Sequence, residues 1–188
     1  MLSITGVLLA GCQDRNPPAA VGPGGEIPAA ASHATNACAR LSDAQAAQVL
    51  SLPAVKSHPE NAEACHWDSG QPDTPFPILN LSVNAYGDEA SAAKLFAATS
   101  GMQSKLSRDV NAALGEKAGE RVPGKGRAPA GLGDEAWLQL DDVAGADTAL
   151  LVVRHAAVVY TLGVAGIGST QGLADRLEAA GRAVVSRP

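Results

Sequence analysis

The chain has 188 residues, of which 46% are hydrophobic and 18% are charged, and its formal net charge at pH 7 is −5. This length supports one domain with a substantial core, whereas the negative charge argues against broad nucleic-acid binding, which needs a basic face. Aromatic residues make up only 3% of the chain, which also disfavours stacking platforms for single-stranded nucleic acids or sugars. We therefore expect no nucleic-acid partner.

A short apolar run near the N-terminus stops at a cysteine. Residues 4–11 are too few to span a bilayer, which takes about 20 apolar residues, but they suit the apolar part of an export signal. Leu9-Ala10-Gly11-Cys12 resembles the lipobox of bacterial lipoproteins, in which the cysteine receives a diacylglyceryl group and becomes the mature N-terminus.

The lipobox resemblance implies a signal peptide over 1–11, acyl chains such as palmitate on Cys12, and an exported protein anchored to the membrane of a bacterial cell envelope. Residues 1–3 contain no Lys or Arg, although export signals usually begin with positive charge, so we expect that the true start lies upstream or was trimmed. The alternative interpretation is an ordinary buried N-terminal segment with a free thiol.

Three cysteines are an awkward number for an exported protein unless one of them is withdrawn from pairing. If Cys12 is lipidated, Cys38 and Cys65 remain and can form a disulfide in an oxidising compartment. The alternative is a pair of free or metal-binding thiols with His66 beside Cys65, but this set lacks the ligand spacing of a zinc site. We expect the disulfide, and neither a metal site nor a cofactor.

The segment after Cys12 is rich in Pro, Gly and Ala and has almost no large apolar side chains, so it cannot build a core. We interpret 12–37 as a flexible tether with a root-mean-square reach of about 25 to 30 Å. The remaining residues, 38–188, are predicted to form a single globular domain.

The predicted elements of this domain begin with a helix over 42–51, because Ser42 and Gln45 have capping-box spacing and Pro53 ends the helix. His58 is assigned to a polar loop in which it meets no other metal ligand. A short strand follows around Trp67.

The next strand, over 78–86, alternates between apolar and polar residues. Its expected core residues are Leu79, Leu81, Val83 and Ala85.

The second half of the domain is predicted to contain one long helix, three strands and a final helix. Asp88 has the position of a helix cap, and the residues between the long helix and the next strand show no sustained period, so they are predicted to be a loop. A hairpin is expected around His155-Ala156, and Ser169 or Thr170 is expected to cap the final helix. The predicted ranges are 89–105 for the helix, 107–130 for the loop, and 135–140, 148–155 and 157–164 for the strands.

The element order is therefore α-β-β-α-β-β-β-α. Such a chain folds most simply as an α+β protein, with a mainly antiparallel sheet and helices packed on it.

Three motifs together resemble the DUF3558-type envelope lipoproteins: ACARLSDAQ before the first helix, the CHW triplet, and GLGDEAW ahead of a closing hairpin and helix. Related small lipoproteins are similar to the Mog1/PsbP-like α/β/α sandwich, so the resemblance implies that fold. It also implies a binding or scaffolding module, and it transfers no catalytic residue.

The GLGDEAW segment is the most function-like stretch, because Gly131, Gly133, Asp134 and Trp137 combine a flexible backbone with a carboxylate and an indole. Asp134 and the adjacent Glu135 could serve acid–base chemistry beside a histidine, but neighbouring strand residues point to opposite faces. The alternative is a structural loop in which Asp134 bonds the backbone and Trp137 enters the core.

Two functions of different class follow. The first is a lipid-anchored, non-catalytic envelope protein whose domain binds a protein, a lipid or a small ligand; the second is an envelope hydrolase with an unrecognised Asp/His site. A pocket that holds His155 together with Asp134 or Glu135 would favour the enzyme. We expect the first.

Overall fold

The structure, a computed structural model, describes residues 36–74, 76–114, 126–143, 146–167 and 171–187. The side chains of residues 102–114, 142, 143, 146 and 147 are not part of that description. The predicted signal peptide, Cys12 and most of the tether therefore lie outside the described residues. All described residues belong to the compact unit Ser32–Pro188.

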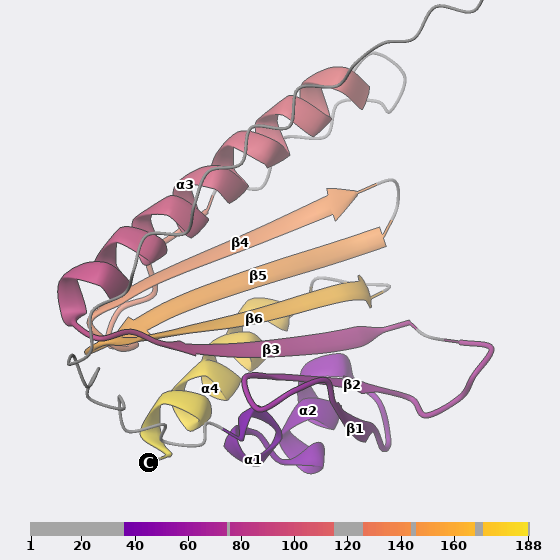
Figure 1. The fold of residues 1–188 in the computed structure, drawn as a ribbon. Helices are drawn as coiled ribbons and strands as arrows, with labels where there is room; N and C mark the ends of the chain where they lie inside the picture. Colours follow the sequence, from indigo (N-terminus) through magenta and orange to yellow (C-terminus); the bar gives the residue numbers. More distant parts are fainter. Residues whose placement is uncertain (1–35, 75, 115–125, 144–145, 168–170, 188) are drawn as a thin grey trace, which may run out of the picture. The chain divides into compact units, whose positions relative to one another are not determined.

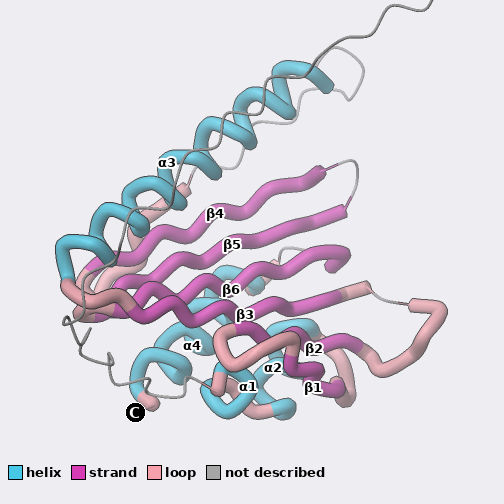
Figure 2. The backbone as a smooth tube through the Cα atoms, viewed as in Figure 1, coloured by secondary structure: helices cyan, strands magenta, loops and turns pink. Residues whose placement is uncertain are grey.

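The centre of the fold is a six-stranded sheet in the order β1-β2-β3-β6-β5-β4, in which every neighbouring pair is antiparallel (Figures 1 and 2). The last strand of the chain, β6, lies in the middle, with β3 on one side and β5 on the other. The strands are β1 (Lys56–Pro59), β2 (Ala64–Asp68), β3 (Ile78–Ala85), β4 (Glu135–Val143), β5 (Ala146–His155) and β6 (Val158–Ile167).

Helices cover both faces of the sheet. The helices α1, α2 and α4 pack on one face, and α3 packs across β4, β5 and β6 on the other (Figure 1). The helices are α1 (Ala37–Arg40), α2 (Asp43–Leu50), α3 (Glu89–Leu114) and α4 (Leu173–Ser186). The predicted α+β class with an antiparallel sheet is confirmed, and the layers are those of an α/β/α sandwich. Among the described helices, none is both long enough and apolar enough to cross a bilayer.

Alternation along the strands sorts the side chains between two cores. On β5, Leu151 and Val153 belong to the larger core under α1, α2 and α4, whereas Val152 belongs to a smaller core under α3. Trp67, in the short strand that the sequence predicted, is fully buried in the larger core. On β3, Leu79, Leu81 and Val83 are buried as expected, but Ala85 is exposed because it lies at the end of the strand.

Local sequence signals explain where two helices begin. Ser42 and Gln45 form the predicted capping box at the start of α2. Asp88 accepts hydrogen bonds from the backbone and side chain of Ser91 at 2.7 and 3.0 Å, which confirms it as the cap of α3. These contacts satisfy N–H groups that have no partner within the helix.

Several predicted boundaries are wrong. The structure contains α1 and β1, which the sequence did not predict, and α3 continues to Leu114, although 107–130 was expected to be a loop. Residues 102–114 contain neither Gly nor Pro, so nothing in that stretch ends a helix that is already formed. The N-cap of α4 is Gly172, in a left-handed conformation, and not Ser169 or Thr170, which lie outside the described residues.

The hairpin between β5 and β6 is confirmed, and its turn consists of Ala156 and Ala157. Ala156 has φ of 49°, a left-handed conformation that is uncommon for a residue other than glycine. The turn therefore needs support from outside the hairpin.

Candidate functional site

The GLGDEAW segment forms a loop that packs its backbone tightly against the end of β5. Gly131 and Gly133 have φ of 67° and 63°. A Cβ atom on Gly133 would lie 2.4 Å from the carbonyl oxygen of Arg154, so this position excludes any side chain. Leu132, between the two glycines, is buried in the larger core. Gly133 thus serves close packing of the loop, whereas Gly131 has open space around it and serves only the left-handed backbone.

Asp134 supports the hairpin turn. Its carboxylate accepts a hydrogen bond from the Ala156 N–H at 2.6 Å, and its own N–H donates to the carbonyl of Arg154 at 2.8 Å. The guanidinium of Arg154 contacts Asp134 at 3.3 Å and Glu135 at 2.5 Å. The two carboxylates therefore converge on one cation and do not point to opposite faces as predicted, because Asp134 precedes the strand.

The contacts within this cluster favour the charged forms of Asp134 and Arg154. The Ala156 N–H, together with the Arg154 guanidinium, holds the pKa of the Asp134 carboxyl below its ordinary value. The Glu135 carboxylate raises the pKa of Arg154. His155 Nδ1 lies 3.8 Å from Asp134 Oδ1, and both side chains are about half exposed. A carboxylate that already has two donors is a weak general base, so the cluster suits structure better than proton transfer.

The expectation that Trp137 enters the core is wrong for the larger core, because Trp137 lies on the opposite face of β4 from Leu138. It is half buried, and its ring lies where a Cβ atom on Gly126 would be. The indole Nε1 has no hydrogen-bond partner among the described residues. Arg127 pairs with Leu138 through two backbone hydrogen bonds of 2.8 Å, which holds residues 126–127 beside this ring.

A pair of open depressions adjoins the helices α2 and α4. One, of about 290 Å³, is lined by Gln45, Gln48 and Arg176 among others, and the second, of about 380 Å³, lies next to Pro77 and shares Arg176. Arg176 donates through Nε to Val49 O at 3.2 Å and through Nη1 to Gln171 O at 3.0 Å. These bonds fix the guanidinium, and its Nη2 has no protein partner in the described part of the chain.

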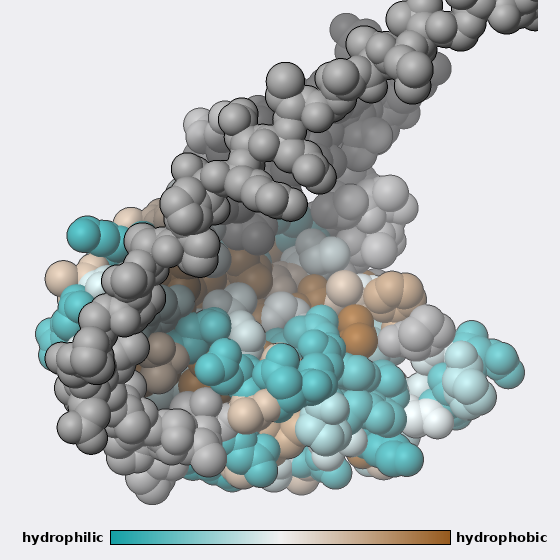
Figure 3. All heavy atoms as spheres, viewed as in Figure 1, coloured by the Kyte–Doolittle hydropathy of each residue, from teal (hydrophilic) through white to brown (hydrophobic). Residues whose placement is uncertain are grey.

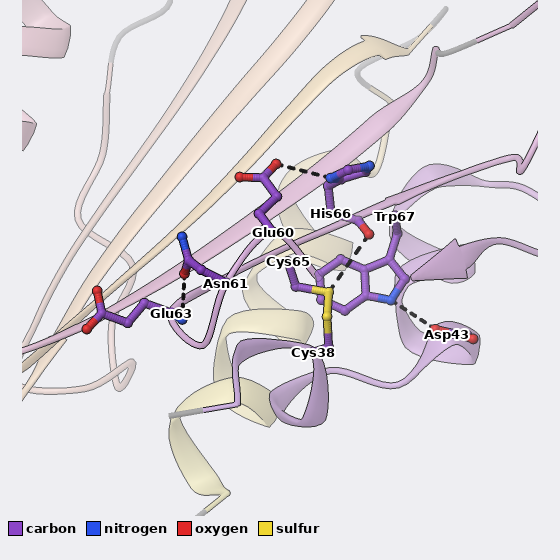
Figure 4. Close-up of a disulfide and its surroundings, with 8 residues drawn as sticks. All are labelled: Cys38, Asp43, Glu60, Asn61, Glu63, Cys65, His66 and Trp67. Atoms are coloured by element: carbon purple, nitrogen blue, oxygen red, sulfur yellow. Dashed lines mark hydrogen bonds and ion pairs between the residues drawn. A yellow bond between two sulfur atoms is a disulfide. The ribbon is translucent and has the colours of Figure 1, made fainter. Parts of the chain in front are cut away.

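The expected disulfide is present. Cys38 in α1 and Cys65 in β2 are bonded with an S–S distance of 2.00 Å (Figure 4). The alternative, in which these sulfurs are free or hold a metal ion, is therefore excluded. Next to the disulfide, the indole of Trp67 donates a hydrogen bond to Asp43 in α2 at 3.0 Å.

Sequence reasoning missed a cluster on the β1–β2 hairpin. His58 was assigned to a loop without other ligands, but it lies in β1, directly opposite His66 of β2. Asp68, two residues after His66, is close to both histidines. The signal in the sequence was the alternation of CHWD: if Cys65 and Trp67 are buried, His66 and Asp68 share the outer face. The sequence did not predict β1, the strand that carries His58.

The comparisons with known proteins give no family. No protein-family model matches the chain, and its sequence matches no curated protein.

Proposed function

We propose that this chain is a lipid-anchored protein of a bacterial cell envelope whose α+β domain binds a ligand or a partner and does not catalyse a reaction. The observation that carries the proposal is the bond between Cys38 and Cys65. Because the chain has three cysteines, this bond leaves Cys12 as the odd one, and Cys12 ends the lipobox-like sequence Leu9-Ala10-Gly11-Cys12. A structural disulfide is also typical of exported proteins.

The arrangement of the proposed parts fits a membrane protein with an outward domain. In this proposal, residues 1–11 are removed as a signal peptide, Cys12 carries the acyl chains, and the Pro- and Gly-rich residues up to 37 are the tether. Two acyl chains on one cysteine give stable membrane attachment, whereas a single chain gives only marginal binding. The resemblance to DUF3558-type lipoproteins and to the Mog1/PsbP-like sandwich is part of the same proposal.

The binding surface that we propose is the one around Arg176. Two depressions meet there, and the side chains that line them include the amides of Gln45 and Gln48 and a fixed guanidinium. Such groups recognise hydrogen-bond acceptors and anionic groups. A small ligand, a lipid headgroup or an envelope protein with an acidic side chain would fit this chemistry.

The alternative function, an envelope hydrolase, has one observation on its side, which is the proximity of His155 to Asp134. The hydrogen bond from Ala156 and the contact with Arg154 weigh against it, because they stabilise Asp134 as an anion. Both side chains are also about half exposed, so the histidine–carboxylate contact is open to water.

The test of the proposal is the intact mass of the protein extracted from membranes, after expression with its native upstream region. We expect a diacylated chain that begins at Cys12 and gains two hydrogens on reduction. The matched control is Cys12→Ser, which should be recovered from the soluble fraction without acyl chains but with the same gain on reduction. An unmodified wild-type chain that is soluble would overturn the anchor and with it the proposed location.

A further inference from the structure

The β1–β2 hairpin presents a polar face on the same side of the sheet as α3, beyond the strands β4, β5 and β6 that α3 contacts. In Figure 3, hydrophilic side chains gather over the region of β1–β3. Antiparallel pairing places His58 opposite His66 and Lys56 opposite Asp68 on this face. Cys65 and Trp67 point the other way, into the core. His58, His66 and Asp68 are therefore fixed as neighbours by the register of the hairpin.

The possible metal-binding atoms of these three residues converge. His58 Nε2 lies 3.5 Å from Asp68 Oδ1, and His66 Nε2 lies 4.0 Å from Asp68 Oδ2. One ligand atom from each residue can be chosen so that all three lie within 4.8 Å of one another. The two imidazole rings are stacked, with centroids 4.9 Å apart and an angle of 19° between their planes.

Glu60 selects the tautomer of the His66 ring. His66 Nδ1 lies 3.1 Å from Glu60 Oε1, and Figure 4 shows these two side chains pointing toward one another, away from the disulfide. An ionised carboxylate only accepts hydrogen bonds, so Nδ1 carries the proton and the lone pair of the neutral ring is at Nε2. A carboxylate behind a histidine in this way is the usual support of a metal ligand.

His58 provides a second, independent observation. Its Nε2 is a buried atom that has no hydrogen-bond partner among the described residues, although Asp68 is nearby. Buried polar atoms without a partner are uncommon in folded proteins. This nitrogen faces the same space as Asp68, and a cation in that space would give it a partner.

We propose that His58, His66 and Asp68 bind one late first-row divalent transition-metal ion, of which Zn²⁺ is the representative. Two imidazoles and one carboxylate suit Zn²⁺, Cu²⁺ or Ni²⁺, whereas Mg²⁺ and Ca²⁺ select oxygen ligands. In a tetrahedral site the ligand atoms lie about 3.3 to 3.6 Å apart, so separations of up to 4.8 Å must shorten by up to about 1.2 to 1.5 Å. Rotation of the three side chains allows this shortening, since none of them is fully buried.

Three protein ligands leave one tetrahedral position for water or for a group from a bound molecule. The side chains of His58, His66 and Asp68 are 36%, 26% and 19% exposed, so an ion can enter from solvent. Asp68 and Glu60 make the site attractive to a cation, and Lys56, which lies across from Asp68, weakens that attraction. The site does not involve the lipid anchor or the surface around Arg176.

The test is a calorimetric titration of the full chain with Zn²⁺. The chain carries Cys12→Ser, so that no free thiol competes, and its disulfide is intact. We expect saturable binding of one Zn²⁺ per chain, weakened at least about 100-fold in His58→Ala and in His66→Gln and about 10-fold in Glu60→Gln. His155→Ala is the matched control, because it removes another exposed histidine near a carboxylate and should leave binding unchanged.

Two readouts keep the result interpretable. Far-ultraviolet circular dichroism shows whether each variant folds, and Co²⁺ in place of Zn²⁺ gives visible absorption bands that report imidazole ligation. Wild-type affinity in folded His58→Ala and His66→Gln, an equal loss in His155→Ala, or no saturable binding at millimolar Zn²⁺ would each overturn the proposal.

Discussion

The Asp134 carboxylate accepts a hydrogen bond from the Ala156 N–H, and this bond holds a hairpin turn in which a non-glycine residue has a left-handed conformation. In the sequence, the same carboxylate next to Glu135 suggests acid–base chemistry. The fold gives it a different task, because Asp134 ties the loop before β4 to the turn after β5. Left-handed backbone at Ala156 is unfavourable by itself and persists only when its surroundings fix it.

This role predicts how stability depends on pH. Because the folded-state pKa of Asp134 is below its ordinary value of 3.8, the carboxylate stabilises the fold above that value, and the stabilisation is lost as the pH falls through the lowered pKa. Asp134→Asn should therefore lower the urea midpoint at neutral pH and flatten its fall between about pH 5 and pH 2.5.

The matched comparison is Asp88→Asn, since the Ser91 hydrogen bonds lower the pKa of Asp88 as well. The two substitutions lie in separate parts of the fold, so their effects should add in the double variant. A pH profile of Asp134→Asn that coincides with the wild type would show that the Ala156 contact has no energetic weight.

At the scale of elements, Trp67 connects β2 to α2. Its side chain is fully buried, and its indole N–H has one partner, Asp43, in the first turn of the helix. Removing the acceptor would leave a buried donor without a partner, which costs about 1 to 3 kcal/mol. The contact therefore fixes the position of α2 on the sheet.

We expect Asp43→Ala to lower the free energy of unfolding by about 1 to 3 kcal/mol. Asp43→Asn should lose much less of this free energy, because the amide oxygen can still accept the hydrogen bond from the indole. Chemical denaturation followed by Trp fluorescence measures both. Equal losses in the two variants would assign the effect to the charge at the helix start and not to the indole bond.

The same elements show what the sequence can and cannot predict. The strand with Leu79, Leu81 and Val83 was predictable because one face of it is buried and the other is not. β1 was not predictable, because Lys-Ser-His-Pro at the edge of the sheet has no apolar alternation. The site on the hairpin was missed for that reason: His66 and Asp68 were visible as one face, but their partner His58 required the pairing of two strands.

Tertiary contacts also override local sequence signals at the start of α4 and along β4. Gly172 begins α4 without a side-chain cap, and the hydroxyl residues before it suggested an earlier start. Trp137, which the structural-loop interpretation placed in the core, lies instead on the α3 side of β4, because the alternation of the strand gives the larger core to Ala136 and Leu138. The register of β4 against its neighbouring strands determines which face carries Trp137, and only the pairing with those strands sets that register.

At the scale of the whole molecule, the disulfide joins the N-terminal end of the domain to the sheet. α1 has only four residues and is too short to be stable alone, and its Cys38 is bonded to a strand 27 positions away. In the unfolded chain, the bond therefore limits how far the segment around Cys38 can separate from the segment around Cys65.

The double variant Cys38→Ala/Cys65→Ala should lose about 3 to 4 kcal/mol of unfolding free energy, the chain-entropy value for a loop of this length. Guanidinium denaturation at equilibrium measures it, and the wild type under a strong reductant should show a similar loss. A loss below about 1 kcal/mol would mean that the unfolded chain already keeps these segments together.

The central position of β6 has a consequence for the time order of folding. In the described sheet, β1–β3 and β4–β5 are joined only through β6, whose residues Ala165 and Val158 pair with Ile78 and Ala85, more than 70 positions earlier in the chain. Contacts between such distant positions form slowly, because a long segment must be closed first. During synthesis, β1–β3 and β4–β5 therefore cannot join into one continuous sheet until residues 158–167 have left the ribosome.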